Sequence, residues 1–327
     1  MTTYIVQRLL WLPILLIVIS LITFALGFYG PGDPVTILAG TKASPQIIEQ
    51  IKKDYGLDQP FYVQYLNYVR NAMQFNFGYS LVKYRDQKVS DLILQRLPIT
   101  IQLNVISLAW SIPLGILFGI LAGVWRNSWV DFVARLVVIG GISLPIILLL
   151  PLLTFSLSRA HEFNLLFINF SLGTFLPVGV GGQWDGIFSN KILLPAFIEG
   201  LGPLAGFTRQ TRAGMINTLR QDYIRTARAK GMREHLVVIR HALRNAFLPL
   251  VTIVGFLISS LVEGSFLVEN WFGVPGVGAL AFDAFSSREY YIILAFVLLS
   301  AVAFVTANLM IDIAYAFVDP RIRYTRT

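Results

Sequence analysis

Three carboxylates stand out because they lie in or beside long apolar segments. They are Glu199, Glu263 and Asp312. An ionised side chain at the centre of a bilayer costs roughly 2.5–3.5 kcal/mol, so each should face a bundle interior, a cavity or a partner. Together they are the candidate residues of a translocation path. Two interpretations of Glu199 stay open: it binds an amino or N–H group of a solute, or it is protonated and hydrogen-bonds a neighbouring carbonyl. Glu263 can instead reach water, and Asp312 can pair with a basic residue.

The most basic segment is residues 209–249, with nine Lys and Arg residues against two acidic ones. We expect Asp222 to cap a short helix, Gly231 to end it in the left-handed conformation, and Glu234 to open the next helix. The two alanines between these caps leave a low surface that can enter a groove of another protein. A positive loop that binds anionic lipid is the alternative. The second helix should carry an apolar set inward: Leu236, Val237, Ile239, Ala242 and Leu243.

Several signatures of enzymes are missing from the sequence. No Gly-Lys dipeptide occurs, so there is no phosphate-binding loop and the chain is not expected to hydrolyse ATP. Without cysteine or a His-Glu-x-x-His motif, a metal site is not expected. A membrane-embedded enzyme lacks a visible nucleophile–base pair. An autonomous secondary transporter or channel needs an ion relay and an internal repeat, and we find neither pattern.

The composition favours a protein embedded in a membrane. The chain has 327 residues, of which 55% are hydrophobic and 13% charged, whereas soluble domains average about 25% charged. We predict an all-α membrane protein with six transmembrane helices. The spans are expected at residues 5–29, 100–124, 136–157, 192–207, 246–268 and 291–317. The first apolar run is too long for a cleaved signal peptide. Gly115, Gly119 and Gly123 predict close helix packing in the second span.

Lys and Arg gather in alternate loops, which places both termini and the basic segment in the cytoplasm. The predicted parts are the N-terminus with the first span (1–29), an extracytoplasmic helical insert (30–98) and a core of five spans (99–327). Within the insert we expect helices at 44–55 and 60–73. The second of these has an apolar face of Tyr62, Tyr65, Leu66, Val69 and Met73.

The basic segment resembles the coupling loop of ABC importer permeases. The matching residues read Arg225-Thr-Ala-Arg-Ala-Lys-Gly231, followed by Arg240-His-Ala-Leu-Arg-Asn-Ala246. More narrowly, they resemble the B-type permease of dipeptide and oligopeptide importers, a branch that shares the departures from the general Glu-Ala-Ala opening. The resemblance implies that this loop docks into a cytoplasmic ATPase. The implied coupling residues are Arg225, Thr226, Ala227, Arg228, Ala229, Lys230, Gly231, His241 and Arg244.

Four other stretches carry the same resemblance. They are Phe77-Gly78-Tyr-Ser80, Glu269-Asn-Trp-Phe272-Gly-Val-Pro275-Gly276-Val-Gly278, Arg288-Glu289-Tyr290 and Asp319-Pro-Arg-Ile-Arg-Tyr324. The second is expected to form a tight re-entry at the membrane edge and to contact an external binding protein. The implied contact residues are Glu269, Phe272, Pro275, Gly276 and Gly278. The insert is either a cap over the pore mouth that meets this binding protein or an element packed on the outer face of the bundle.

The resemblance also implies a fold, partners and a location. The fold is that of a type I ABC importer permease in a bacterial or archaeal cytoplasmic (inner) membrane. The partners are a homologous second permease, two ATPase subunits, an extracytoplasmic binding protein, a peptide substrate and membrane lipid, and no nucleic acid. This chain needs no cofactor, since the ATPases use ATP and Mg. The implied solutes are dipeptides or oligopeptides, with a nickel chelate, a cell-wall peptide or another small solute as alternatives.

Overall fold

The structure is a computed structural model. It describes residues 2–29, 57–159, 163–165, 168–170 and 184–318, and the single positions 46, 49 and 53. The described part is mostly helical, which agrees with the predicted all-α class. A short antiparallel pair of three-residue strands, β1 (Phe163–Leu165) and β2 (Ile168–Phe170), is added to it. Most of the helix expected at 44–55 lies outside the described residues, and the three described positions within it, 46, 49 and 53, are helical. The C-terminal motif at 319–324 lies outside them altogether.

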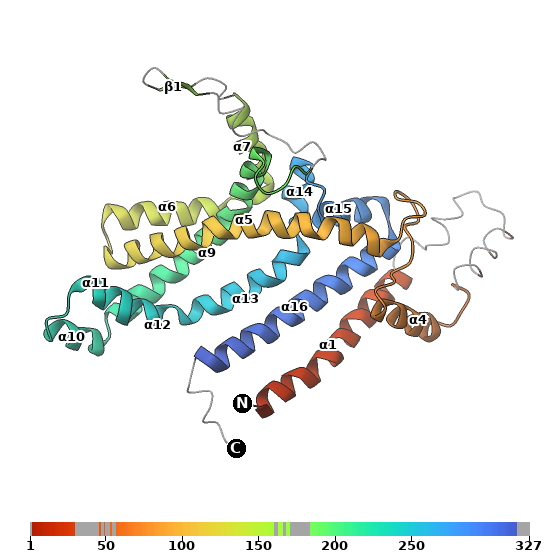
Figure 1. Ribbon diagram of the computed structural model, residues 1–327, viewed down its shortest axis with the longest axis horizontal. Helices are drawn as coiled ribbons and strands as arrows, with labels where there is room; N and C mark the ends of the chain where they lie inside the picture. Colours follow the sequence, from red (N-terminus) through yellow and green to blue (C-terminus); the bar gives the residue numbers. More distant parts are fainter. Residues whose placement is uncertain are drawn as a thin grey trace.

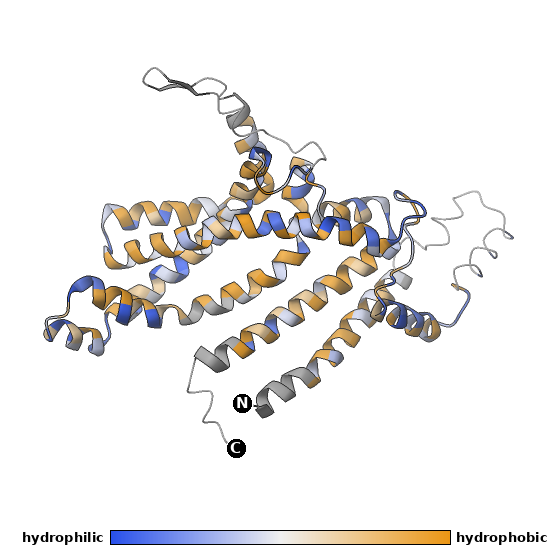
Figure 2. Ribbon diagram, in the orientation of Figure 1, coloured by the Kyte–Doolittle hydropathy of each residue, from blue (hydrophilic) through white to orange (hydrophobic). Residues whose placement is uncertain are grey.

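Three helices are long and apolar enough to cross a membrane alone: α1 (Thr2–Tyr29), α5 (Val89–Val124) and α16 (Tyr290–Val318). Two bent helix pairs raise this number to five in the described part, so the predicted count of six is not confirmed. Figure 1 shows α1, α13 and α16 side by side, and Figure 2 shows that apolar residues dominate them. The orientation across the membrane stays a prediction.

The second span starts earlier than predicted. Helix α5 begins at Val89 and continues through Pro98, which lies inside it. The boundary predicted at residue 98 between insert and core therefore falls within one helix. The fourth span also differs, because α9 (Leu193–Leu219) carries on into the first part of the basic segment. We expected a loop there, and polar residues in this second half make α9 less apolar than the candidate spans.

The predicted third span at 136–157 is broken, and the loop expected before it is partly helical. Helix α6 (Trp129–Ser143) and α7 (Ile146–Arg159) are bent by 104° at the break. Leu144 is extended there, with φ −91° and ψ 117°. It precedes Pro145, whose ring disfavours a helical conformation in the preceding residue. The proline therefore accounts for the end of α6.

The fifth span is bent as well. After α12 (Arg244–Ala246), α13 (Leu248–Glu263) and α14 (Phe266–Phe272) meet at 44°. Gly264 stands at the break with φ +70°, a conformation that favours glycine. Helix α15 (Val277–Ser287) then leads into α16. The break between α13 and α14 brings Gly264 close to the buried Glu269 side chain of α14.

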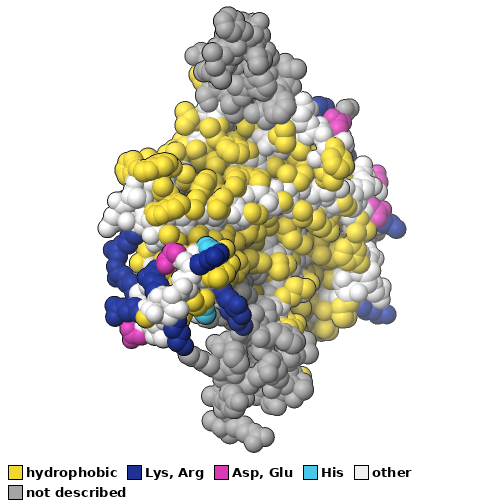
Figure 3. Space-filling view, turned by 60° about the vertical axis from the view of Figure 1, so that its left-hand side comes forward, with side chains coloured by type: hydrophobic (Ala, Val, Ile, Leu, Met, Phe, Trp, Pro, Cys, Tyr) yellow, Lys and Arg dark blue, Asp and Glu magenta, His cyan; other side chains and the backbone are white. Residues whose placement is uncertain are grey.

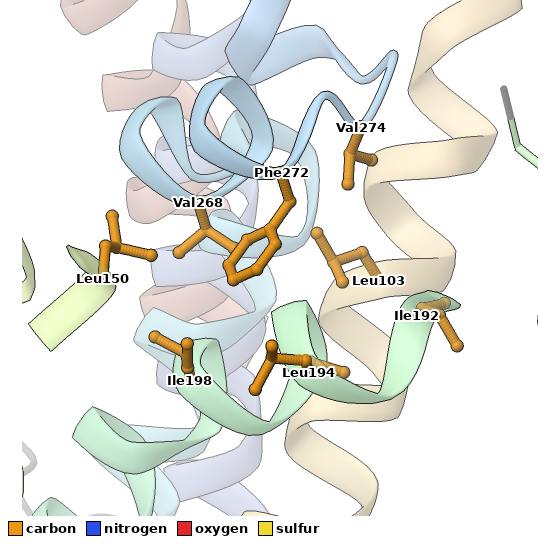
Figure 4. Close-up of a cluster of buried hydrophobic side chains, with 9 residues drawn as sticks. Leu103, Leu150, Ile192, Leu194, Ile198, Val268, Phe272 and Val274 are labelled. Atoms are coloured by element: carbon orange, nitrogen blue, oxygen red, sulfur yellow. The ribbon is translucent and has the colours of Figure 1, made fainter. Parts of the chain in front are cut away.

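Helices α5 and α9 pack closely along the predicted glycine stripe. A Cβ atom at Gly115 would lie 2.8 Å from the carbonyl oxygen of Leu204, and one at Gly123 would lie 2.5 Å from the Cβ of Met215. Such distances leave no room for a side chain, so the packing prediction is confirmed. At the other end of this pair, a buried cluster joins α5, α9, α7 and α14 (Figure 4). Its labelled members include Leu103, Leu150, Ile198 and Phe272.

Candidate functional site

The basic segment begins with α10 (Asp222–Ala229). The N-cap is Gln221, whose backbone is extended, and it makes no side-chain capping bond. The prediction that Asp222 caps this helix is therefore wrong, because Asp222 is already helical. Its carboxylate accepts from Arg225 at 3.3 Å instead, within the first turn.

The end of α10 follows the prediction. Gly231 has φ +75° and follows the C-cap Lys230. The N–H of Gly231 donates to the carbonyl of Arg228 at 2.9 Å, and the N–H of Met232 donates to that of Ala227 at 3.3 Å. This pair of bonds is the Schellman motif, which satisfies carbonyls that the helix leaves free. No other group lies within 4 Å of a Cβ placed at Gly231, so the backbone conformation is what requires glycine there.

A π-helix changes which side chains of the next segment are buried. Glu234 opens α11 (Glu234–Leu236) as predicted, but η2 (Val237–Leu243) is a π-helix with a wider turn than an α-helix. As a result Val238 is buried beside the expected Val237 and Ala242, while two expected members, Leu236 and Ile239, are exposed. The predicted apolar set is thus wrong at these two positions.

Most of the predicted coupling residues lie on one exposed surface. Arg225, Thr226, Arg228, Ala229, Lys230, Gly231 and Arg244 are exposed and His241 is half-buried. Ala227 is the exception: it packs with Ile224 and Met215 in a buried cluster, so a contact with a partner through its side chain does not fit. Figure 3 shows the Lys and Arg side chains gathered beside a largely apolar surface.

An ion pair joins α10 to α11 across the glycine turn. The guanidinium of Arg228 donates to both carboxylate oxygens of Glu234, at 3.0 and 2.5 Å. This hydrogen bonding lowers the pKa of Glu234 and raises that of Arg228 above their usual values. About half of each side chain is exposed, so the pair contributes little stability. The pair spans the glycine turn and connects the two short helices.

A second pair, at the base of this segment, was missed from the sequence. Asp131 of α6 is fully buried and accepts from Arg212 of α9 at 2.5 and 2.9 Å. The N–H of Asn127 also donates to it at 3.0 Å. Arg212 was counted only as one of nine basic residues, and residues 81 apart gave no local signal. The pair connects α6 to the helix that leads directly into α10.

The predicted binding-protein contacts are largely internal. Glu269 is fully buried, and its carboxylate accepts from the hydroxyl of Thr100 and the N–H of Ala279, each at 2.9 Å. Cβ atoms at Gly264 and Gly278 would lie 2.6 and 2.9 Å from its oxygens, and one at Gly276 would also overlap it. Phe272 is buried in the cluster of Figure 4. Direct contact therefore does not fit these residues in this structure, and only the half-buried Pro275 remains a candidate.

Two of the other recognised motifs meet in the structure. The buried carboxylate of Glu289 accepts from the hydroxyl of Ser80 at 2.6 Å and from three successive N–H groups, of Leu81, Val82 and Lys83, at 2.9, 2.9 and 2.5 Å. Burial raises the pKa of Glu289, but these four hydrogen bonds outweigh it, and the pKa lies below its usual value. The sequence showed both motifs but could not show that they pair across 209 positions.

The three carboxylates of the predicted path are not brought together. Glu199 of α9 is half-buried, interacts with the Ser265 side chain and lies near Glu269, and its Oε2 atom is buried without a hydrogen-bond partner in the described structure. Glu263 ends α13 and is half-buried. Asp312 of α16 borders an apolar groove between α1, α13 and α16. Among the described residues, no group of three or more acidic or His side chains could hold a metal ion.

Comparison with known proteins gives consistent matches over the chain. The family described as binding-protein-dependent transport system inner membrane component matches residues 115–324, and its N-terminal region matches residues 1–104. The glutathione transport system permease protein GsiC of Shigella flexneri serotype 5b (strain 8401) and that of Escherichia coli (strain K12) are each 38% identical over 324 residues, 99% of this chain and 100% of the relative. GsiC of Shigella boydii serotype 4 (strain Sb227) is 37% identical over the same coverage.

Proposed function

Because this chain belongs to the family of binding-protein-dependent transport system inner membrane components, the ABC importer permeases, we propose that it moves peptides across the cytoplasmic membrane by alternating access. It does so with a homologous permease, two ATPase subunits that use ATP and Mg, and an external binding protein. We keep the division into a first span, an external insert and a core, with the insert ending where α5 begins at Val89. Both termini and the basic segment face the cytoplasm.

The observation that carries this proposal is the exposed coupling surface on α10 and its turn. Its two short helices are joined by the Schellman motif and by the Arg228–Glu234 pair. It is also tied to the bundle by the Asp131–Arg212 pair at its base. A surface that protrudes, keeps its shape and connects to long helices suits a part that is pushed by a partner. No reaction needs to occur on it.

Peptides are the proposed solute because of the relatives and of Glu199. The named relatives are glutathione transport proteins, and glutathione is a small peptide with a free amino group. A buried carboxylate oxygen without a partner is expensive unless another group satisfies it. We infer that the ammonium or N–H groups of a passing peptide do so at Glu199. Nickel chelates and other small solutes are the alternatives, and no such observation favours them.

The test of the coupling surface is co-purification. The chain is tagged, extracted in detergent with the subunits that accompany it, and assayed for ATP hydrolysis stimulated by peptide. Gly231→Asp should release the ATPase subunits, because it strains a left-handed turn and adds negative charge to a basic surface. The matched control is Gly186→Asp, which also has positive φ and open space around its Cβ but precedes α9. Release by both variants, or by neither, would contradict the proposal.

The test of Glu199 is the variant Glu199→Gln. Uptake of peptides with a free amino terminus should fall, whereas N-acetylated peptides should be affected less. The control is Asp91→Asn, which removes an exposed carboxylate in the first turn of α5 that is not a candidate for the translocation path. Unchanged uptake of every peptide in the Glu199 variant would refute the assigned role and leave the coupling surface untouched.

A further inference from the structure

Helix α4 (Phe61–Met73) packs against α1 through aromatic side chains. The rings of Phe61, Tyr65 and Tyr68 lie with their centroids 5.5, 5.7 and 5.3 Å from that of Phe24. The Tyr65 hydroxyl lies 2.9 Å from Ser20 Oγ and donates to the carbonyl of Ile17 at 3.1 Å. These contacts determine how far along α1 the helix lies.

The part of α1 that α4 contacts lies inside the candidate membrane span of α1. That segment runs from Leu10 to Gly27, and the α1 residues touched by α4 all belong to it. Ile17 lies roughly 15 Å from the end at Gly27, at about 1.5 Å of rise per residue. A tyrosine side chain is much shorter than that distance, so α4 cannot lie in water beyond the end of α1. It lies beside the last turns of the span (Figure 1).

The outward face of α4 is apolar. Tyr62, Leu66 and Met73 are 65%, 62% and 78% exposed. With Val69 they occupy a sector of roughly 60° when residues are spaced 100° apart, next to the face that packs on α1. These four residues belong to the apolar face predicted from the sequence. The fifth predicted member, Tyr65, packs on α1 instead. Leu26, near the end of α1, is another exposed apolar residue, with 69% of its surface exposed.

The polar side chains of α4 are turned elsewhere. Gln64 is buried and donates to the carbonyls of Leu57 and Gln59. Asn67 and Asn71 line a cavity of about 230 Å³ between α4 and α16. The helix therefore separates its amides, which face the cavity, from an apolar stripe that nothing in the described structure covers.

We propose that α4 is an interfacial helix that binds lipid acyl chains through Tyr62, Leu66 and Met73, at the membrane boundary near the end of α1. Depth decides between the possible occupants. Phe24 lies inside the candidate span of α1, so a water-soluble protein would have to enter the membrane to reach this stripe, and cover by a membrane-embedded partner is one outcome of the test below. A single amphipathic helix at that level buries its apolar face at the headgroup–acyl boundary. Arg70 borders the stripe and is exposed, so its long side chain can extend its charge to water.

The test uses the absence of cysteine in this chain, which allows one spin label at a time without background. The full chain, with any subunits that co-purify, is placed in lipid nanodiscs as Leu66→Cys, Met73→Cys or, on the opposite side of α4, Asn71→Cys. Collision of the label with oxygen, which concentrates in lipid, is compared with collision with a water-soluble nickel chelate. Leu26→Cys is the lipid reference, and the exposed Asp58→Cys is the water reference.

Labels at Leu66 and Met73 should collide mainly with oxygen, as at Leu26, and the label at Asn71 should favour nickel. Preferential collision with nickel at Leu66 and Met73 would place the stripe in water and overturn the proposal. Weak collision with both reagents would mean that protein covers the stripe, and would overturn it equally. All sites are exposed, so labelling should leave folding intact, and agreement between two stripe positions guards against a local defect. The readout requires that the chain spans a membrane but involves no transport, so its failure leaves the proposed function standing.

Discussion

The turn at Gly231, in the proposed coupling surface, and the turn around Gly276, after α14, both need glycine, but for different reasons. At Gly231 the space around a Cβ is open, and only the positive φ requires glycine. At Gly276 the φ is −96°, which any residue can adopt, and glycine is needed because the Glu269 carboxylate fills the space. The motif at Gly231 has most of its side chains exposed. The motif at Gly276 surrounds the buried side chain of Glu269, which belongs to the same motif.

This difference assigns the two motifs different tasks. A motif whose side chains are exposed can be read by another protein, whereas a motif that encloses a buried carboxylate holds two helices at a fixed angle. Glu269 connects α14, α15 and α5 through Ala279 and Thr100. We therefore expect substitutions in the second motif to reduce stability and those in the first to reduce coupling.

Glu269→Ala should give the largest loss of stability. It leaves the buried N–H of Ala279 and the hydroxyl of Thr100 without their acceptor. Each orphaned donor costs roughly 1–3 kcal/mol, and the cavity adds to that cost. Thermal unfolding in detergent measures the effect, with Glu263→Ala as the control. An equal loss for both variants would mean that the enclosed carboxylate is not special.

Asp131→Ala tests whether burial or location decides the effect, since Asp131 is buried but lies next to the coupling segment. Removing one partner of a buried ion pair costs about 3–5 kcal/mol. We expect the lower end, about 3 kcal/mol, because Arg212 is 24% exposed. The exposed Asp222→Ala, read by the same thermal unfolding, is the control. If both variants unfold at the same temperature as the parent, burial of a carboxylate does not explain which substitutions reduce stability.

The buried carboxylate of Glu289 should make stability depend on pH. Its pKa is lowered in the folded state, so its contribution is fully present above the unfolded pKa, about 4.3, and is lost as pH falls through the folded value. The amides of residues 81–83 should lose protection against hydrogen exchange in that acidic window. Glu289→Gln should lose this pH dependence and cost about 1–3 kcal/mol at neutral pH. A parent whose amides stay protected throughout would contradict the assignment.

The sequence predicted what is encoded locally. The end of α10 at Gly231, the start of α11 at Glu234 and the glycine stripe against α9 depend on residues a few positions apart, and the structure confirms all three. Contacts at long separation were invisible. The pairs Asp131–Arg212 and Ser80–Glu289 join residues that look like ordinary charged or polar positions.

Errors in the helices have equally specific causes. The third span was drawn through Pro145 because composition alone does not report a 104° bend. The apolar set after Glu234 was assigned with an α-helical period, and the π-helix at Val237–Leu243 changed that period. The family resemblance implied that Glu269 contacts a binding protein, and in the structure its carboxylate is buried and accepts from Thr100 and Ala279.

Gly231→Ala should reduce stability only slightly. Its Cβ meets no atom, so the cost is that of a left-handed conformation, about 1 kcal/mol, confined to the turn. ATPase stimulation by peptide should nevertheless fall, because α10 and α11 lose their fixed angle. Gly186→Ala, with φ +88° outside the coupling segment, should cost similar stability without this functional loss. Equal activity in the two variants would remove the distinction between the motifs.

Exchanging the charges of the pair at the coupling surface should have the smallest effect on stability. Arg228→Glu with Glu234→Arg restores an ion pair between two exposed side chains, and such a pair contributes about 0.2–1 kcal/mol. Thermal unfolding of the double variant should therefore match the parent. The surface presented to the ATPase is altered, however, because a negative charge now stands on α10. If the pair only fixes the helix angle, ATPase stimulation should survive in the double variant and fall in either single variant. If the ATPase contacts Arg228 itself, the double variant should fail like Arg228→Glu, and the coupling surface extends to that side chain.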